Sequence, residues 1–168
     1  MTTVRIEPWG PDDLSLVQKV MGDPRMTEHL GGPESPEKLA DRQERYAKLA
    51  ETGTGRMFKI VDVDSGEAVG SVGYWEKEWQ DGVVYETGWS VLPEFQGRGI
   101  AAAATRQALD VAGSEKKHRW VHAYPSVDNA ASNAICRKLG FELLGAFDFE
   151  YPPGNPLRCN DWRFDLQA

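Results

Sequence analysis

The sequence has few cysteines, no long apolar run and no surplus of positive charge. Its two cysteines, Cys136 and Cys159, are too few for a disulfide framework. No stretch approaches the roughly 18 consecutive apolar residues of a membrane-spanning helix, and the first residues lack the apolar segment of a signal peptide. We therefore expect a cytoplasmic protein that has no membrane partner.

Positive charge is in the minority, because 26 acidic residues face 19 basic ones and the formal net charge is −7. This balance argues against a nucleic-acid partner, because proteins that bind nucleic acids present a basic surface to the phosphates. It suits a cationic substrate such as an amine, although a negative surface more often serves solubility. The histidines, His29, His118 and His122, show no zinc-type spacing, so we expect no metal. His29 is read most simply as a solvated loop residue.

The length predicts one domain, residues 1–168, of the α/β (α+β) class. Alternating, β-branched and aromatic residues predict strands over 3–7, 57–63, 67–75, 83–92, 119–124, 141–150 and 160–166. Asp-containing turns at 64–66 and 79–82 predict that the second, third and fourth strands form an antiparallel meander. Helices are predicted from Pro11, from Pro36 (with Ser35 as N-cap) to about Ala50, from the glycine-rich turn at 96–101, and over 128–139.

The stretch from Tyr85 to Ala112 predicts a strand, a turn and an alanine-rich helix. Pro93 ends the strand because proline has no N–H for a ladder. The turn brings Gly97 and Gly99 to the head of the helix, where the first N–H groups lack partners and the helix dipole is positive. Two glycines alone are more often only turn residues. The preceding strand, the proline and the small residues that follow favour a phosphate site instead.

Two segments carry a family resemblance. VLPEFQGRGIA, residues 91–101, resembles the acyl-CoA-binding motif of the GNAT superfamily of N-acetyltransferases, with Gln96, Gly99 and Ala101 at its defining positions. NAASNAICRKLGF, residues 129–141, resembles the next helix of that family, which ends in Leu-Gly-Phe. This second segment looks most like the RimJ/RimL branch, which acetylates N-termini of ribosomal proteins and includes relatives that modify small molecules.

The resemblance covers residues 56–150 strongly, and it implies a fold, an activity and a binding site. The fold would be a central mixed sheet of about seven strands, largely antiparallel with one splayed parallel step, flanked by about four helices. The activity would be acetyl transfer from acetyl-CoA to a primary amine by direct attack in a ternary complex, and a homodimer would be common. The residues implied to hold acetyl-CoA are Val91, Leu92, Gln96, Gly97, Arg98, Gly99, Ile100, Ala101, Asn129 and Ser132.

Within this set, the resemblance divides the work between backbone and side chains. It implies that the backbone N–H groups of residues 96–101 bind the diphosphate, and that the backbone of Val91 and Leu92 contacts the pantetheine arm. Arg98 either adds charge or is a solvated loop residue. Gly88 is a candidate site for a bulge in the strand that meets the cofactor.

The acceptor amine must lose a proton before it attacks. A lysine ammonium has a pKa of ~10.4 and an α-amine one of ~7.7–8.0. The base therefore removes a proton far more easily from a peptide N-terminus than from a lysine side chain. Glu86 stands ten residues before Gln96, where the RimJ/RimL-like pattern carries an acid, and is the predicted catalytic base. Burial would raise its pKa and let it act through a water. The alternative is a strand glutamate that is solvated or paired with a lysine.

The leaving thiolate requires a proton. Ser132 lies three residues after Asn129, so both project from one helix face, and the resemblance places Ser132 near the thiol. Many relatives have a tyrosine acid where this chain has Cys136, which leaves Ser132, Tyr124 or water as the acid. A free cysteine such as Cys136 is more often a buried small hydrophobe than a nucleophile.

Three residues of the third strand and the turn after it, Trp75, Glu76 and Glu78, are candidates to face a cationic acceptor, with packing as the simpler role of the tryptophan. Two rival functions stay open at this point. One is a small-amine or antibiotic-modifying acetyltransferase, and the other is a non-catalytic acyl-CoA-binding module.

Overall fold

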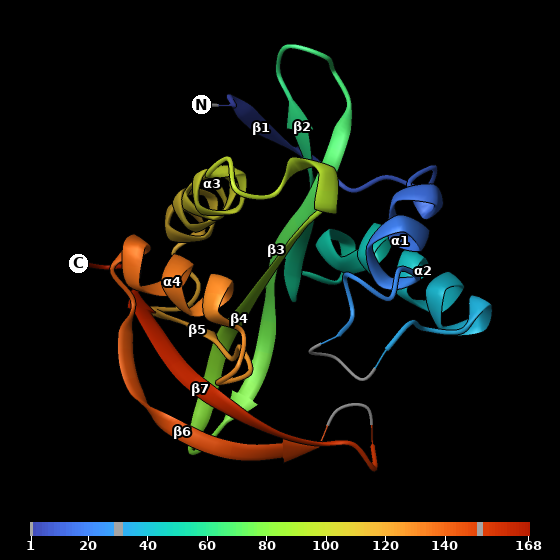
Figure 1. The fold of residues 1–168 in the computed structure, drawn as a ribbon. Helices are drawn as coiled ribbons and strands as arrows, with labels where there is room; N and C mark the ends of the chain where they lie inside the picture. The colour runs from blue at the N-terminus through green and yellow to red at the C-terminus, as the bar shows by residue number, and fades with distance from the viewer. Residues whose placement is uncertain (1, 29–31, 151–152) are drawn as a thin grey trace.

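A seven-stranded sheet forms the centre of the fold, which a computed structural model describes for residues 2–28, 32–150 and 153–168 (Figure 1). The sheet order is β1-β2-β3-β4-β5-β7-β6. The strands are β1 (Val4–Pro8), β2 (Gly55–Asp62), β3 (Ala68–Trp79), β4 (Gly82–Val91), β5 (Trp120–Ala123), β6 (Glu142–Glu150) and β7 (Pro156–Asp165). The helices are α1 (Leu14–Met21), α2 (Pro36–Thr52), α3 (Ile100–Glu115) and α4 (Ala130–Leu139), with a short 3-10 helix η1 (Pro93–Phe95) before α3. This mixed sheet and its helices confirm the expected fold class, while His29 lies outside the described residues.

Two helical layers cover opposite faces of the sheet (Figure 1). Buried residues of α3 and α4, such as Leu109 and Leu139, pack in one core with strand residues such as Tyr85. Val17 of α1 and Leu39 of α2 pack in a second core on the other face. The sheet is therefore covered by helices on both faces near its middle.

The sheet is antiparallel except at β4 and β5. These two parallel strands pair only at Tyr85↔Val121 and Glu86↔His122, although β4 continues to Val91. Beyond Glu86 the strands diverge, which confirms the expected splayed step. The divergence leaves one edge of β4 without a neighbouring strand.

No bulge accompanies the splay. The register between β3 and β4 runs without a shift through Gly73↔Gly88, so the expectation of a bulge at Gly88 is wrong. The absence of a side chain matters at this position for another reason: a Cβ on residue 88 would lie only 3.1 Å from Cη2 of Trp75. Gly88 thus leaves room for an indole on the face of the sheet that carries α1 and α2.

Local sequence signals fix the ends of the helices. Ser35 Oγ accepts a hydrogen bond from the Lys38 N–H at 3.3 Å, which confirms the predicted cap of α2. Asn129 caps α4 in the same way, and Gly140 ends that helix with φ of 90°. α1 begins at Leu14 rather than at Pro11, because the carboxylate of Asp13 turns back to accept from the Gly10 N–H.

Two strands are longer than predicted. β3 runs to Trp79 instead of residue 75, and β7 starts at Pro156 instead of residue 160. In both cases the added residues are paired with a neighbouring strand, up to Trp79↔Gly82 and Glu150↔Pro156. Cross-strand pairing thus extends these strands beyond the segments that alternate in sequence.

Candidate active site

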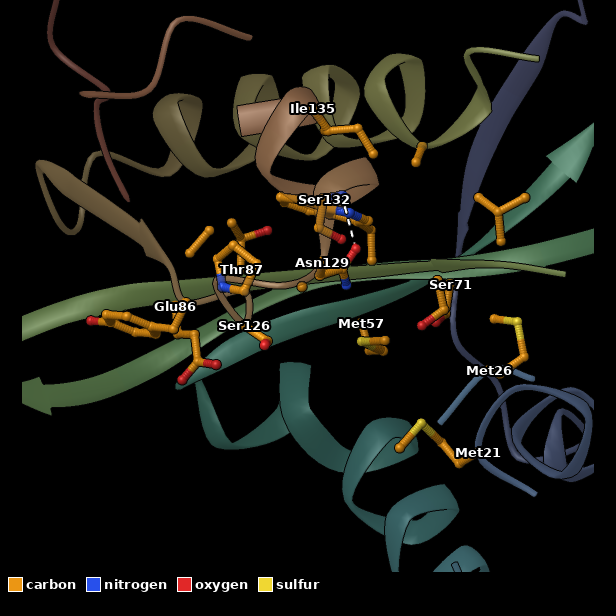
Figure 2. A pocket seen from close by; sticks show the side chains of 18 of the residues that line it. Met21, Met26, Met57, Ser71, Glu86, Thr87, Ser126, Asn129, Ser132 and Ile135 are labelled. Atoms are coloured by element: carbon orange, nitrogen blue, oxygen red, sulfur yellow. Dashed lines mark hydrogen bonds between the residues drawn. The ribbon is translucent and has the colours of Figure 1, made fainter. Parts of the chain in front are cut away.

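A groove of about 1840 Å³ crosses the molecule over β4 and beneath the first turn of α4. Figure 2 shows Asn129 and Ser132 projecting into it from α4, with Glu86 at one end and Met26 towards the other. Of the predicted site residues, those that line the groove are Glu86, Val91, Gln96, Gly97, Gly99, Ile100, Ala101, Asn129 and Ser132. Leu92 and Arg98 do not line it.

The turn before α3 forms an open anion cradle. Gly97 and Gly99 have φ of 78° and 76°, a left-handed backbone that favours glycine. A Cβ built at either position meets nothing within 4 Å, so space lies open beside both residues. Within the described part of the chain, the N–H groups of residues 97–102 donate no hydrogen bond. Six unpaired donors at a positive helix end fit a diphosphate.

The side chains around the cradle shape the loop. Gln96 Nε2 donates to the carbonyl of Val91 at 2.9 Å and so ties the turn to the end of β4. Arg98 donates to the carbonyl of Glu94 at 3.2 Å and lies over the ring of Phe95 at 5.3 Å. These contacts hold Arg98 outside the groove and agree with its alternative role as a loop residue.

Val91 and Leu92 turn their backbones in opposite directions. The Leu92 N–H donates to the carbonyl of Val69 at 2.9 Å, on the β3 side. Because backbone groups alternate in direction along a strand, Val91 and Trp89 face the gap left by β5. Val91 therefore has the orientation expected for a contact with the pantetheine arm, and Leu92 contributes a buried side chain to the core beside α1.

Glu86 lies where β4 and β5 stop pairing. Its side chain is 25% exposed, and a carboxylate oxygen lies 3.5 Å from Lys77 Nζ. Burial raises the pKa of Glu86, and the neighbouring ammonium of Lys77 opposes part of that rise. Sequence analysis offered two alternatives for Glu86, a base with a raised pKa and a strand residue paired with a lysine. The structure shows the raised pKa and the lysine partner together.

The first turn of α4 is held rigidly over the groove. Asn129 Oδ1 accepts from the Ser132 N–H at 3.1 Å, while the half-buried Ser132 side chain lines the groove (Figure 2). Asn133, which sequence analysis missed, donates to the carbonyls of Ser126 and Asn129 at 3.0 and 2.8 Å. Its Oδ1 accepts from the Trp162 indole at 2.9 Å, so a buried amide joins the loop before α4 to β7.

The two cysteines and Tyr124 differ in their surroundings. Cys136 is fully buried in the core under α4, where burial raises the pKa of its thiol to about 12, and it does not line the groove. Cys159 is buried in β7 and does line it. Tyr124 also lines the groove, and its hydroxyl is buried without a partner among the described residues. Burial raises the pKa of Tyr124, so its phenol stays protonated and can donate.

The three acceptor candidates on β3 differ in their surroundings. Trp75, Glu76 and Lys77 all line the groove. The carboxyl of Glu76 is engaged by His118 at 2.5 Å and by Lys117 at 3.0 Å, and these two partners lower its pKa. Glu78 is exposed and does not line the groove, so an acceptor role is not supported for this residue.

Within the described ranges, no group of three or more His, Cys, Asp or Glu side chains is arranged to hold a metal ion. The same part of the chain contains no helix that is long and apolar enough to cross a membrane.

Solved structures show the same fold. RimL, a ribosomal L7/L12 α-N-protein acetyltransferase in complex with coenzyme A, superposes with a TM-score of 0.83 at 22% identity over 100% of this chain and 97% of that one. The ribosomal-protein-S5-alanine acetyltransferase of Vibrio fischeri gives 0.82 at 18% identity over 100% and 96%. Spermidine N-acetyltransferase of Vibrio cholerae, in complex with CoA and spermine, gives 0.80 at 17% identity over 98% and 96%. The fold is therefore that of the N-acetyltransferases.

Comparison of the sequence, unlike comparison of the fold, identifies the family. The family model described as Acetyltransferase (GNAT) domain matches residues 3–142, and the chain belongs to this family of acyltransferases. A curated relative, the uncharacterised N-acetyltransferase YoaA of Bacillus subtilis, is 26% identical over 132 residues, which are 78% of this chain and 74% of YoaA. GNAT acetyltransferases use acetyl-CoA, and the open cradle before α3 fits the diphosphate of that donor.

Proposed function

We propose that residues 1–168 act as one domain that transfers the acetyl group of acetyl-CoA to the primary amine of a peptide or protein N-terminus. The observation that carries this proposal is a single groove with an anion cradle along its length and a partly buried carboxylate at one end. A donor held by the cradle and lying along the unpaired edge of β4 would direct its reacting end towards Glu86.

Backbone groups bind acetyl-CoA more than side chains do. The N–H groups of residues 97–102 bind the diphosphate, and the small side chains of Ala101 and Ala102 let it approach the helix. Trp89 and the N–H of Val91, whose carbonyl already accepts from Gln96, offer backbone groups to the pantetheine arm in the gap between β4 and β5. Asn129 keeps the first turn of α4 in place above that arm. Acetyl-CoA, when bound, supplies the acetyl thioester.

Two proton transfers accompany the reaction. The amine nitrogen attacks the thioester carbonyl carbon, so a C–N bond forms and the C–S bond breaks. Glu86 accepts the proton that the amine loses, directly or through a water. Ser132 or Tyr124 donates a proton to the departing sulfur, and both line the groove. No covalent bond between the enzyme and the acetyl group is required.

An N-terminal α-amine is favoured over a lysine side chain because far more of it is neutral near pH 7. The fold shared with RimL and with the S5-alanine acetyltransferase is consistent with this choice. The fold shared with spermidine N-acetyltransferase supports the second candidate, a small-amine acetyltransferase. The acceptor must therefore be tested with both classes of amine.

The test is release of free thiol from acetyl-CoA against peptides with free N-termini, spermidine and an aminoglycoside. We expect release with the free peptides and none with the same peptides carrying an N-acetyl group. Release with spermidine or the aminoglycoside alone would select the small-amine function instead. If coenzyme A bound in calorimetry and no amine released thiol, the chain would be a non-catalytic acyl-CoA-binding module.

We also propose a homodimer through the later strands. β6 is the last strand in the sheet order and is exposed along almost all its length. Leu143 and Leu144 on it are 49% and 45% exposed, and adjacent exposed leucines offer apolar surface to a second copy of the chain. Sedimentation analysis should give twice the monomer mass, and replacing both leucines with lysine should return the mass to that of a monomer.

A further inference from the structure

The ammonium of Lys77 sits in an aromatic cage that the reaction outlined above does not use. Its Nζ lies 5.5, 4.9 and 5.3 Å from the ring centroids of Trp79, Tyr124 and Phe149. The Glu86 carboxylate completes the surroundings at 3.5 Å. Aromatic rings with a carboxylate are the surroundings in which proteins recognise an ammonium group. Lys77 therefore fills a cation-binding site that belongs to the chain itself.

Two aromatic walls of this cage, Trp79 and Tyr124, are held by contacts that do not involve Lys77. The Trp79 indole N–H donates to Asp161 Oδ2 at 3.1 Å, and Asp161 Oδ1 lies 2.6 Å from His122 Nδ1. The side chains of His122 and Asp161 are only 6% and 9% exposed. The Trp79 ring also packs against Tyr124 at 4.9 Å between centroids. A buried network thus holds Trp79 in place with Tyr124 packed against it, so these two walls would persist if the lysine left the cage. The third ring, Phe149 of β6, is 41% exposed.

The cage lies at the end of the groove where the acceptor would react. Lys77, Glu86, Tyr124 and Phe149 all line the groove that also contains Ser132. An acceptor amine that approaches Glu86 therefore comes within a few ångströms of a fixed positive charge. That charge disfavours a second ammonium on the acceptor, and it favours the neutral form of the reacting amine.

We propose that Lys77 is a specificity-determining residue, which occupies the cation subsite of the acceptor end and excludes amines that carry a second ammonium near the reacting one. The inference rests on the proposed N-acetyltransferase function and narrows its substrate class. Monocationic acceptors such as peptide N-termini fit beside Lys77, whereas polyamines must displace it. Without the lysine, the same rings and Glu86 would receive the second ammonium of a polyamine.

The test compares the wild type with Lys77→Met, which keeps the length of the side chain without its charge, and with Lys77→Arg, which keeps the charge. Spermidine binding is measured without acetyl-CoA, by quenching of tryptophan fluorescence and by calorimetry at physiological salt. We expect Lys77→Met to bind spermidine about tenfold more tightly than the wild type, and Lys77→Arg to resemble the wild type. Thiol release should shift in the same direction, from peptide towards spermidine.

Equal spermidine affinity in the wild type and Lys77→Met would overturn the proposal, and so would a wild type that acetylates spermidine as efficiently as the peptide. Should Lys77→Met fail to fold, Lys77→Gln carries the same comparison. The equilibrium measurement separates this inference from the proposed function. Absence of thiol release with every amine would refute the enzyme, while the binding comparison would still decide the role of Lys77.

Discussion

Glu86 and His122 face each other as the last paired residues of the only parallel step in the described sheet. On one side of this pair the strands are joined, and on the other they separate to give the gap beside Val91. A carboxylate at such a point is partly buried by the closed side and faces the open one. The end of strand pairing thus accounts for both the raised pKa of Glu86 and its access to the groove.

The first prediction concerns Glu86 as the base. Because the carboxylate must be ionised to accept a proton and burial raises its pKa, turnover should fall as pH drops through that raised pKa. Glu86→Gln should lower turnover about 10²–10⁴-fold and abolish this acidic limb. Coenzyme A affinity, measured by calorimetry, should stay within about twofold of the wild type. An unchanged turnover and pH profile at saturating substrate would rule out Glu86.

The second prediction concerns the cradle. Gly99→Trp should abolish measurable acetyl-CoA binding in calorimetry, because the side chain would fill the space beside the unpaired N–H groups. The matched control is Gly66→Trp, which has a similar φ of 74° and also meets nothing within 4 Å, but does not line the groove. Both variants bear the same backbone strain, so equal loss of affinity in the two would argue against the cradle.

The third prediction concerns the proton donor. Tyr124→Phe removes a buried hydroxyl that has no partner among the described residues, so it should cost little stability. If Tyr124 is the acid, turnover should fall about 10²-fold or more while Ser132→Ala stays near the wild type. The opposite ranking would assign the role to Ser132. Equal and small effects in both variants would leave solvent water as the donor.

The sequence was sufficient for the elements whose signals are local. Ser35, Pro93 and Gly140 act through their own backbone or cap, so the ends of α2, β4 and α4 could be predicted to within a few residues. The glycine-rich turn was equally readable, because left-handed φ at Gly97 and Gly99 depends on the residue type itself. Order and spacing of these signals indicated the α/β class, and the family resemblance implied the splayed mixed sheet.

What the sequence could not give depends on contacts between distant segments. Lys77, Tyr124 and Phe149 come from β3, the end of β5 and β6, and no local pattern predicts that they meet. The ion pair of Glu86 with Lys77 has the same origin, since it depends on the strand register. The sequence indicated the role of Asn133 only weakly, because it is a polar residue one turn after Asn129 on the inner face of a helix.

The central claim is that the N–H groups before and within the first turn of α3 grip a diphosphate and direct a thioester along the open edge of β4. A crystal structure of the protein soaked in coenzyme A tests this most directly. The account predicts the diphosphate against residues 97–102, the pantetheine arm beside Val91 and the sulfur between Ser132 and Glu86. A diphosphate bound elsewhere, with this turn closed by side chains, would contradict it.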